Sequence, residues 1–138
     1  MCEKYFIIER RDNMNNEIKT KKAPAAIGPY SQGIVAGEFA YVSGQIPVNP
    51  ETGEVVSDKI EDQARQSLNN VKAVLEEADF SLEDVIKTTC FIADMSDFAT
   101  FNKVYSEFFT GTCPARSCIA AKELPKKVLC EVEVIAHK

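Results

Sequence analysis

Near the C-terminus, charged residues lie in segments whose other members are small or apolar. Arg116 is flanked by alanine, serine and cysteine, and Glu131 and Glu133 alternate with apolar residues. Side chains alternate between faces along a strand, so Arg116 would share a face with Cys118 and Ala120. A guanidinium in such surroundings needs an anionic partner, because an unpaired buried charge is costly. An arginine and a carboxylate together could hold a small carboxylic acid and orient a water molecule.

The chain between these charged groups decides whether they can meet. Pro114–Ala121 and Lys126–Ala136 are both predicted to be strands, and residues 122–127 are short enough for a hairpin or a tight connection. This predicts that Arg116 and one of the two glutamates face the same cleft. On residue types alone, the alternative is that Arg116 belongs to a structural ion pair.

Two earlier segments contain further candidates for a site. Residues 23–33 hold two prolines and two glycines, which favour a loop, yet this loop also carries Ile27 and Tyr30. It is either a rigid wall that presents Tyr30 to a site or a packed connector. Ile34–Pro47 predicts a β-hairpin that turns at Gly37. Gly44 inside its second strand indicates a bulge or the close approach of another group.

Two helices must position these loops and strands. A stripe of apolar residues predicts the first helix, capped by Asp58 with Glu61 completing a capping box. The β-branched run 85–93 predicts a strand, after which Asp94 or Ser96 caps a second helix that ends at Gly111. The stripe of the first helix consists of Ile60, Ala64, Leu68, Val71, Val74, Leu75 and Ala78, and the buried face of the second consists of Phe98, Phe101, Tyr105 and Phe108. Asn102 departs from that aromatic face and points either outward to solvent or into a cleft.

The element order predicts one α+β domain over residues 17–138, with a mixed sheet of five to six strands. Residues 1–16 are interpreted as an N-terminal extension that is disordered, with an extra edge strand as the alternative. Two helices can cover only one face of such a sheet. Small and apolar residues lie on both faces of the last strands, so neither face has the polar character of a solvated surface. We therefore expect the helix-free face to be buried in a homo-oligomer.

Composition excludes several classes of protein. The chain has 138 residues and a formal net charge of −5, which argues against a nucleic-acid partner. It has five cysteines without a C-x-x-C pair, and His137 is the single histidine, so a metal site is not expected. Reduced thiols fit a cytoplasmic location. No apolar stretch approaches the roughly 18 residues that a membrane span needs.

Several segments, taken in order, resemble the Rid/YjgF family, the reactive-intermediate imine deaminases that have also been called L-PSP endoribonucleases. The resemblance covers roughly residues 17–137. The matching segments are Ala23–Gly33, Ser43–Pro47, Gln63–Val71, Pro114–Cys118 and Glu131–Glu133. It implies a chorismate-mutase-like fold, a homotrimer with a central barrel, and sites in the clefts between subunits. It also implies hydrolysis of 2-iminobutanoate, 2-iminopropanoate and similar 2-imino acids or enamines to 2-oxo acids and ammonia, without cofactor or metal.

The resemblance also assigns roles to individual residues. Arg116 is similar to the arginine that binds the substrate carboxylate, and Glu131 to the glutamate that orients or deprotonates the attacking water. Tyr30 would close the pocket, and Asn102 would form a polar wall. Gly44 and Cys118 would offer backbone contacts; a nucleophilic role for the Cys118 thiol is disfavoured because no histidine lies nearby in sequence.

Two departures from the family pattern, and two other functions, remain open on the sequence alone. The connector 109–113 is shorter than usual, which would reshape the rim of the cleft, and residues 1–16 have no counterpart. The same clefts could instead bind a small carboxylate without turnover, as in a regulatory protein. A ribonuclease is the third hypothesis, against which the acidic charge and the lone terminal histidine speak.

Overall fold

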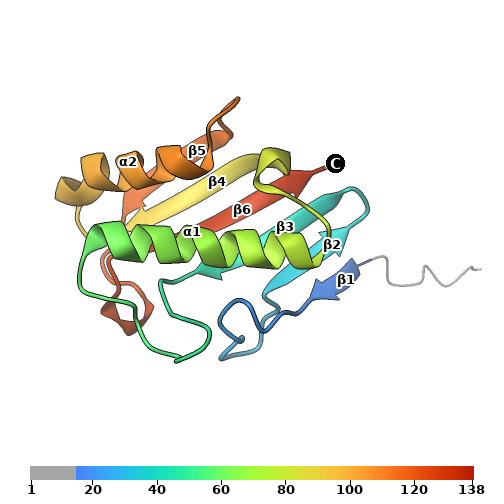
Figure 1. Cartoon of the computed structure of the whole chain (residues 1–138), viewed down its shortest axis with the longest axis horizontal. Helices are drawn as coiled ribbons and strands as arrows, with labels where there is room; N and C mark the ends of the chain where they lie inside the picture. Colours follow the sequence, from blue (N-terminus) through green and yellow to red (C-terminus); the bar gives the residue numbers. More distant parts are fainter. Residues whose placement is uncertain (1–14) are drawn as a thin grey trace, which may run out of the picture.

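The computed structural model describes residues 15–138, which form one six-stranded mixed sheet and two α-helices (Figure 1). The strand order is β1-β2-β3-β6-β4-β5, and all neighbours are antiparallel except β4 and β5. Along the chain the elements are β1 (Asn15–Ile18), β2 (Gly33–Ala36), β3 (Phe39–Gln45), α1 (Ile60–Glu77), β4 (Val85–Ile92), α2 (Phe98–Phe108), β5 (Ala115–Ala120) and β6 (Cys130–His137). Short 3-10 turns cover Leu82–Asp84, Met95–Asp97 and Pro125–Lys127.

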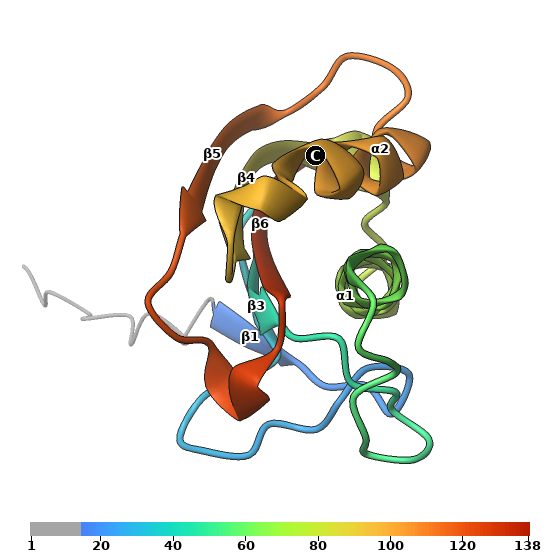
Figure 2. The ribbon, with the colours of Figure 1, turned by 90° about the vertical axis from the view of Figure 1, so that its left-hand side faces the viewer.

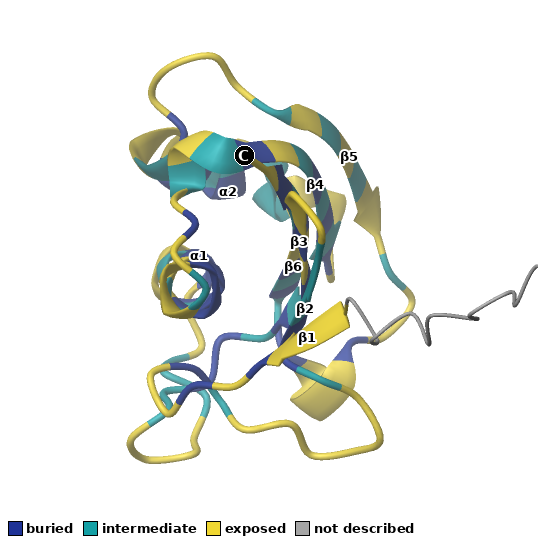
Figure 3. Ribbon diagram, turned by 90° about the vertical axis from the view of Figure 1, so that its right-hand side faces the viewer, coloured by how far each residue is buried: buried dark blue, intermediate teal, exposed yellow. Residues whose placement is uncertain are grey.

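Both helices lie on the same face of the sheet, which confirms the predicted α+β architecture (Figures 2 and 3). The core lies between this face and the helices, and its largest fully buried side chains include Phe101, Leu68 and Leu75. The opposite face has no covering element among residues 15–138 (Figure 3). It exposes large apolar side chains, including Tyr41 of β3 and Ile119 of β5, which are 46% and 50% exposed.

The first strand includes two residues that the sequence assigned to the N-terminal extension. Asn15 and Asn16 pair with β2 as part of β1, and the strand ends at Ile18. The prediction of a disordered extension over residues 1–16 is therefore wrong for Asn15 and Asn16, and residues 1–14 lie outside the described residues. The hairpin formed by β2 and β3 turns at Gly37, as expected, where φ is +58° and a glycine avoids the steric cost of the left-handed conformation.

The start of helix α1 differs from the prediction. Asp58 does not cap the helix: the N-cap is Lys59, and no side chain caps it. Ser57 orders the turn before the helix, because its hydroxyl accepts a hydrogen bond from the Lys59 N–H at 3.0 Å and donates one to Asp62 at 2.8 Å. The predicted cap at Asp58 is therefore wrong.

The second helix begins after a capped turn and ends without glycine. Asp94 accepts a hydrogen bond from the Ser96 N–H at 2.8 Å and so begins the 3-10 turn that leads into α2. Gly111 does not end the helix, because α2 stops at Phe108. The next residue, Phe109, has φ −116° and ψ 86° and packs its ring 4.6 Å from the Tyr105 ring. The chain therefore leaves the helical conformation at Phe109, and Gly111 does not act as a left-handed cap.

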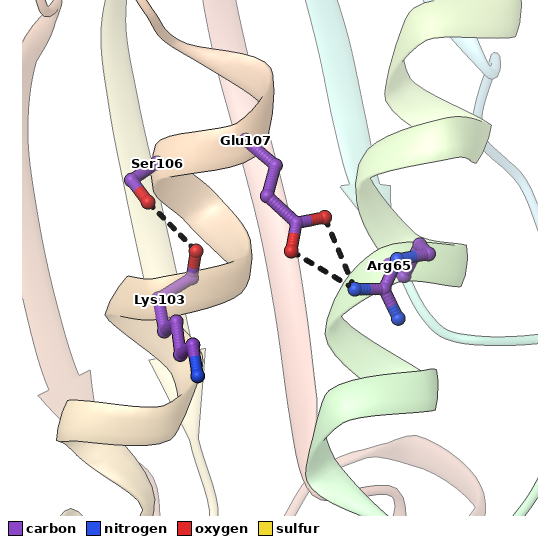
Figure 4. Close-up of polar contacts among 4 residues, drawn as sticks. All are labelled: Arg65, Lys103, Ser106 and Glu107. Carbon is purple, nitrogen blue, oxygen red and sulfur yellow. Dashed lines mark hydrogen bonds and ion pairs between the residues drawn. The ribbon is translucent and has the colours of Figure 1, made fainter.

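An ion pair joins the two helices on their outer side (Figure 4). One guanidinium nitrogen of Arg65 in α1 donates to both carboxylate oxygens of Glu107 in α2, at 3.0 and 3.2 Å. Both side chains are about half exposed, so the pair contributes little to stability, on the order of 0–1 kcal/mol.

The topology corrects the expectation for the last two strands. β5 and β6 do not form a hairpin: β4 lies between them, parallel to β5 and antiparallel to β6. The connection from β5 must therefore pass over the end of β4, and a 3-10 turn at Pro125–Lys127 completes it. β5 is left as an edge strand, which places Arg116 at the margin of the sheet.

Candidate functional site

Arg116 lies on edge strand β5 and faces helix α2. One of its guanidinium nitrogens donates a hydrogen bond to Asn102 Oδ1 at 2.7 Å. The central guanidinium carbon lies 4.7 Å from the centre of the Tyr105 ring and 5.5 Å from that of Phe98. Within residues 15–138, no carboxylate comes within ion-pair distance of this guanidinium. Its positive charge is therefore half-buried against aromatic rings and a neutral amide, and it is available to an anion from outside.

Cys118 follows Arg116 on the same face of β5, directly opposite Cys90 of β4. Burial raises the pKa of the Cys118 thiol, and the nearby Arg116 charge opposes this only in part. The thiol therefore stays protonated at neutral pH, which disfavours a nucleophilic role and leaves the backbone role intact.

Glu131 of β6 and Gly44 of β3 form a second group. The register between β3 and β6 shifts between Val42 and Gln45, so Gly44 lies in the irregularity that the sequence indicated. A side chain at Gly44 would collide with the Glu131 carboxylate: a methyl group at this position would meet the Oε1 atom and lie 2.9 Å from Cδ. The glycine thus leaves room for the carboxylate to lie against the backbone of β3.

The Tyr30 loop closes one side of this group. Tyr30 is 49% exposed, and its hydroxyl accepts a hydrogen bond from the Ile27 N–H at 3.4 Å. Ser43 holds the loop by donating to the Ser31 carbonyl at 2.6 Å. A cavity of about 290 Å³ results, lined by Ile27, Tyr30, Ser43, Gly44, Ile46, Pro125 and Glu131. The loop is therefore a pocket wall, one of the two interpretations left open by the sequence.

The carboxylate in this pocket has altered acidity. Partial burial raises the pKa of Glu131 above its ordinary value, and the neighbouring negative charge of Glu133 adds to the effect. A carboxylate with a raised pKa is a stronger base than an exposed glutamate, which suits a group that accepts a proton from water.

The structure does not bring the two groups together within one chain, contrary to the shared cleft expected from a hairpin. Arg116 is opposite Thr88 of β4, whereas Glu131 is opposite Phe91. Because neighbouring positions on a strand point to opposite faces, Arg116 lies on the helix face and Glu131 on the helix-free face. The site residues therefore form two half-sites: Asn102, Arg116 and Cys118 in one, and Tyr30, Gly44 and Glu131 in the other.

Buried amides support the second half-site, and sequence reasoning missed them. Gln32 donates to the carbonyls of Thr20, Ala23 and Pro24 and accepts from the Thr20 N–H. Asn70 donates to the carbonyls of Ile46 and Val48. Gln63 donates to the Ser57 carbonyl and accepts a hydrogen bond from the Leu129 N–H. The signal was available, because polar residues at positions 63, 67 and 70 interrupt the buried side of the first helix. Satisfied amides of this kind fix loops that have no regular structure.

Two other kinds of site are not found in residues 15–138. No group of three or more histidine, cysteine, aspartate or glutamate side chains is placed to hold a metal ion there. Neither α-helix in this part of the chain combines the length and the apolar character needed to cross a membrane.

Comparison with known proteins identifies relatives over nearly the whole chain. Residues 20–138 match the family model described as Endoribonuclease L-PSP. A RutC family protein from Pyrococcus horikoshii is 53% identical over 91% of this chain and 99% of its own length. An Escherichia coli 2-iminobutanoate/2-iminopropanoate deaminase is 54% identical over 89% of this chain and 98% of its own length. The crystal structure of E. coli TdcF with bound serine superposes with a TM-score of 0.86 at 50% identity, covering 89% of this chain and 98% of that one.

Proposed function

This chain belongs to the Rid/YjgF family, also described as Endoribonuclease L-PSP, and we propose that it hydrolyses short-chain 2-imino acids. The substrates are 2-iminobutanoate, 2-iminopropanoate or their enamine tautomers, and the products are 2-oxo acids and ammonia. The observation that carries the proposal is the Arg116 guanidinium, which has no carboxylate partner within residues 15–138. A 2-imino acid supplies the missing anion.

The reaction divides between the two half-sites. Arg116 binds the substrate carboxylate through its free N–H donors, and the hydrogen bond to Asn102 fixes the orientation of the guanidinium. Glu131 accepts a proton from a water molecule, whose oxygen forms a bond to C2 of the protonated imine. The amine of the resulting carbinolamine takes the proton back from Glu131 and leaves as ammonia when the C–N bond breaks. The hydroxyl becomes the carbonyl of the 2-oxo acid, and its proton passes to the released ammonia. Because the protonated imine is already electrophilic, positioning supplies much of the catalysis.

The remaining site residues shape the pocket. Tyr30 and Ile27 enclose the side chain of the substrate, which fits the largely apolar lining of the cavity. The backbones of Gly44 and Cys118 offer hydrogen-bonding groups to the substrate, and the protonated Cys118 thiol takes no covalent part.

The site requires more than one copy of the chain, and we assign it to a homotrimer. Three features support this assembly: the two half-sites face opposite sides of the sheet, β5 is an exposed edge, and the helix-free face exposes Tyr41 and Ile119. When a second copy packs its β5 edge near the Glu131 pocket, Arg116 of one subunit completes the pocket of another. The hydrophobic helix-free face is buried by the same assembly.

The test is ammonia release from freshly generated 2-iminobutanoate and 2-iminopropanoate, compared between the wild type and Arg116→Ala. We expect turnover in the wild type and loss of most of it in the variant, with unchanged oligomeric state. Wild-type turnover in a folded, assembled Arg116→Ala protein would overturn the role of Arg116.

A non-catalytic function is the second candidate, because one relative was solved with serine, an amino acid that has no imine. In that case the chain binds small carboxylates at Arg116 and releases no ammonia from any imino acid. Binding of 2-oxobutanoate, measured by calorimetry together with the ammonia assay, separates the two functions.

A further inference from the structure

We propose that Tyr105 and Phe98 form an aromatic slot that holds the Arg116 guanidinium in place, with Tyr105 as a positioning residue anchored through Thr88. This inference rests on the proposed function, because it concerns how the substrate-binding cation is held. It assigns a role to two aromatic residues that the sequence identified only as the buried face of a helix.

The slot follows from the spacing of residues on helix α2. Phe98, Asn102 and Tyr105 lie four and three residues apart, so they occupy one side of the helix. That side faces β5, where all three contact the same guanidinium: the two rings at 5.5 and 4.7 Å and the amide oxygen at 2.7 Å. One helix face thus provides the hydrogen bond and both cation–π contacts found for the guanidinium within residues 15–138.

Thr88 links Tyr105 to the strand that lies beside Arg116. Its side-chain oxygen lies 2.8 Å from the Tyr105 hydroxyl, and it is fully buried in β4. Thr88 is also the residue directly opposite Arg116 in the parallel pairing of β4 and β5. Thr88 therefore lies beside Arg116 in the sheet and also contacts the tyrosine whose ring lies beneath the guanidinium.

An aromatic slot suits a cation that must remain available to a substrate. A carboxylate partner would neutralise the guanidinium and compete with the substrate, whereas the face of a ring attracts the cation without neutralising it. Burial raises the pKa of Tyr105, so the hydroxyl stays protonated and cannot become a competing anion. An unsupported arginine on an edge strand would lose much of its side-chain entropy on binding substrate, which the slot avoids.

The experiment compares two buried aromatic residues of the same helix. In Tyr105→Leu the ring beneath the guanidinium is lost, whereas in the control Phe101→Leu a fully buried ring is lost that packs 6.1 Å from Tyr105 without contacting Arg116. We expect Tyr105→Leu to weaken 2-oxobutanoate binding and to lower kcat/KM by about 10- to 30-fold. The control should stay within about twofold per folded site, whatever its loss in Tm. Tyr105→Phe keeps the ring and should lose only about threefold.

Chemical rescue by added guanidinium distinguishes loss of the slot from general damage to the core. In Arg116→Ala, millimolar guanidinium, far below denaturing concentrations, should enter the empty slot and restore part of the 2-oxobutanoate binding. Rescue should persist in Arg116→Ala/Phe101→Leu and disappear in Arg116→Ala/Tyr105→Leu. Equal rescue in both double variants, no rescue in any variant, or equal losses for Tyr105→Leu and Phe101→Leu would overturn the slot.

The binding readout also separates this inference from the proposed function. If the wild type binds 2-oxobutanoate but deaminates no imino acid, the function fails, and the slot is still judged by binding and rescue. If the wild type is a deaminase and Tyr105→Leu binds and reacts as the control does, the slot alone fails.

Discussion

Replacing Gly44 by alanine tests the proposed role of Glu131 without touching the glutamate itself. The new methyl group would collide with the Glu131 Oε1 atom and lie 2.9 and 3.1 Å from Cδ and Cγ. Gly44 does not have the positive φ that disfavours alanine, so its backbone can accept the substitution. The Glu131 side chain must therefore move, and its carboxylate must leave the pocket wall.

We expect Gly44→Ala to have a small effect on stability and a large effect on activity. Displacing a side chain from its rotamer costs about 0.5–1.5 kcal/mol. Replacing glycine by alanine in a strand recovers about 0.4–1 kcal/mol, because the unfolded chain has fewer accessible conformations. These contributions nearly cancel, so we expect little change in Tm. A catalytic group misplaced by about 1 Å loses on the order of 100-fold in rate, and we expect this loss in kcat/KM.

The assay measures ammonia release from 2-iminobutanoate for four proteins: the wild type, Gly44→Ala, Glu131→Ala and the double variant. Gly111→Ala is the matched control, since a methyl group there meets nothing within 4 Å. If Gly44→Ala acts through Glu131, it should have no further effect in the Glu131→Ala background. The control should keep the activity of the wild type.

Two results would refute this reasoning. Gly44→Ala with wild-type turnover would show that the position of the carboxylate does not matter. An equal loss from Gly44→Ala with and without Glu131 would show that the glycine acts independently, for instance through its backbone contact with the substrate.

Three other contacts among the described residues can be tested. Burial raises the folded-state pKa of Glu131, so the wild type loses stability as pH rises from below the unfolded pKa through the folded one. Glu131→Gln should therefore raise Tm at neutral pH and lose this advantage in acid. Glu133→Gln removes a negative charge that raises the pKa of Glu131, so it should shift the acid limb of the kcat/KM profile to lower pH. A shift to higher pH would contradict the role of Glu131 as the base. Asp79 follows the C-cap residue of α1 and has φ 61°, and the next N–H, that of Phe80, donates to the Leu75 carbonyl. Asp79→Gly should therefore stabilise by about 0.5–1 kcal/mol in urea unfolding, and a loss would show that the Asp79 carboxylate has a structural role. Arg65→Ala should cost less than about 1 kcal/mol in the same measurement, since the ion pair with Glu107 is half exposed, and a larger cost would mean that it fixes the helices.

Sequence predicted the elements of this fold better than their adjacency. Periodicity gave both helices, and turn chemistry at Gly37 gave the hairpin of β2 and β3, because these signals are local. The insertion of β4 between β5 and β6 is not local, so the short link between the last two strands suggested a hairpin that does not exist. The cap predictions failed for a different reason, because the sequence offers several local candidates at each helix end. Ser57, and not Asp58, forms the hydrogen bonds before α1, and α2 ends before Gly111 is reached.

The same distinction applies to the site. Alternation along β5 correctly placed Arg116 and Cys118 on one face, and the glycine within β3 correctly indicated a close approach. The buried amides of Gln32 and Asn70 were missed because a polar residue inside an apolar stripe does not reveal which loop it holds. The position of Glu131 relative to Arg116 depends on the strand order and on the register of β6. An inserted strand separates the two residues, and a one-residue change of register moves a side chain to the other face of the sheet.

Because the half-sites lie on opposite faces of the sheet, activity and assembly should be inseparable, and complementation between inactive variants tests this directly. Arg116→Ala lacks one half-site and Glu131→Ala lacks the other. In the proposed homotrimer, re-formed from an equal mixture, a site is intact when its arginine comes from a Glu131→Ala subunit and its carboxylate from an Arg116→Ala subunit. Random assembly then restores about a quarter of the wild-type turnover. A site built within one chain would restore none, because every subunit in the mixture lacks one of the two groups. Recovery that appears only after dissociation and reassembly would place the reaction between subunits, and its absence in verified mixed trimers would contradict the half-site arrangement.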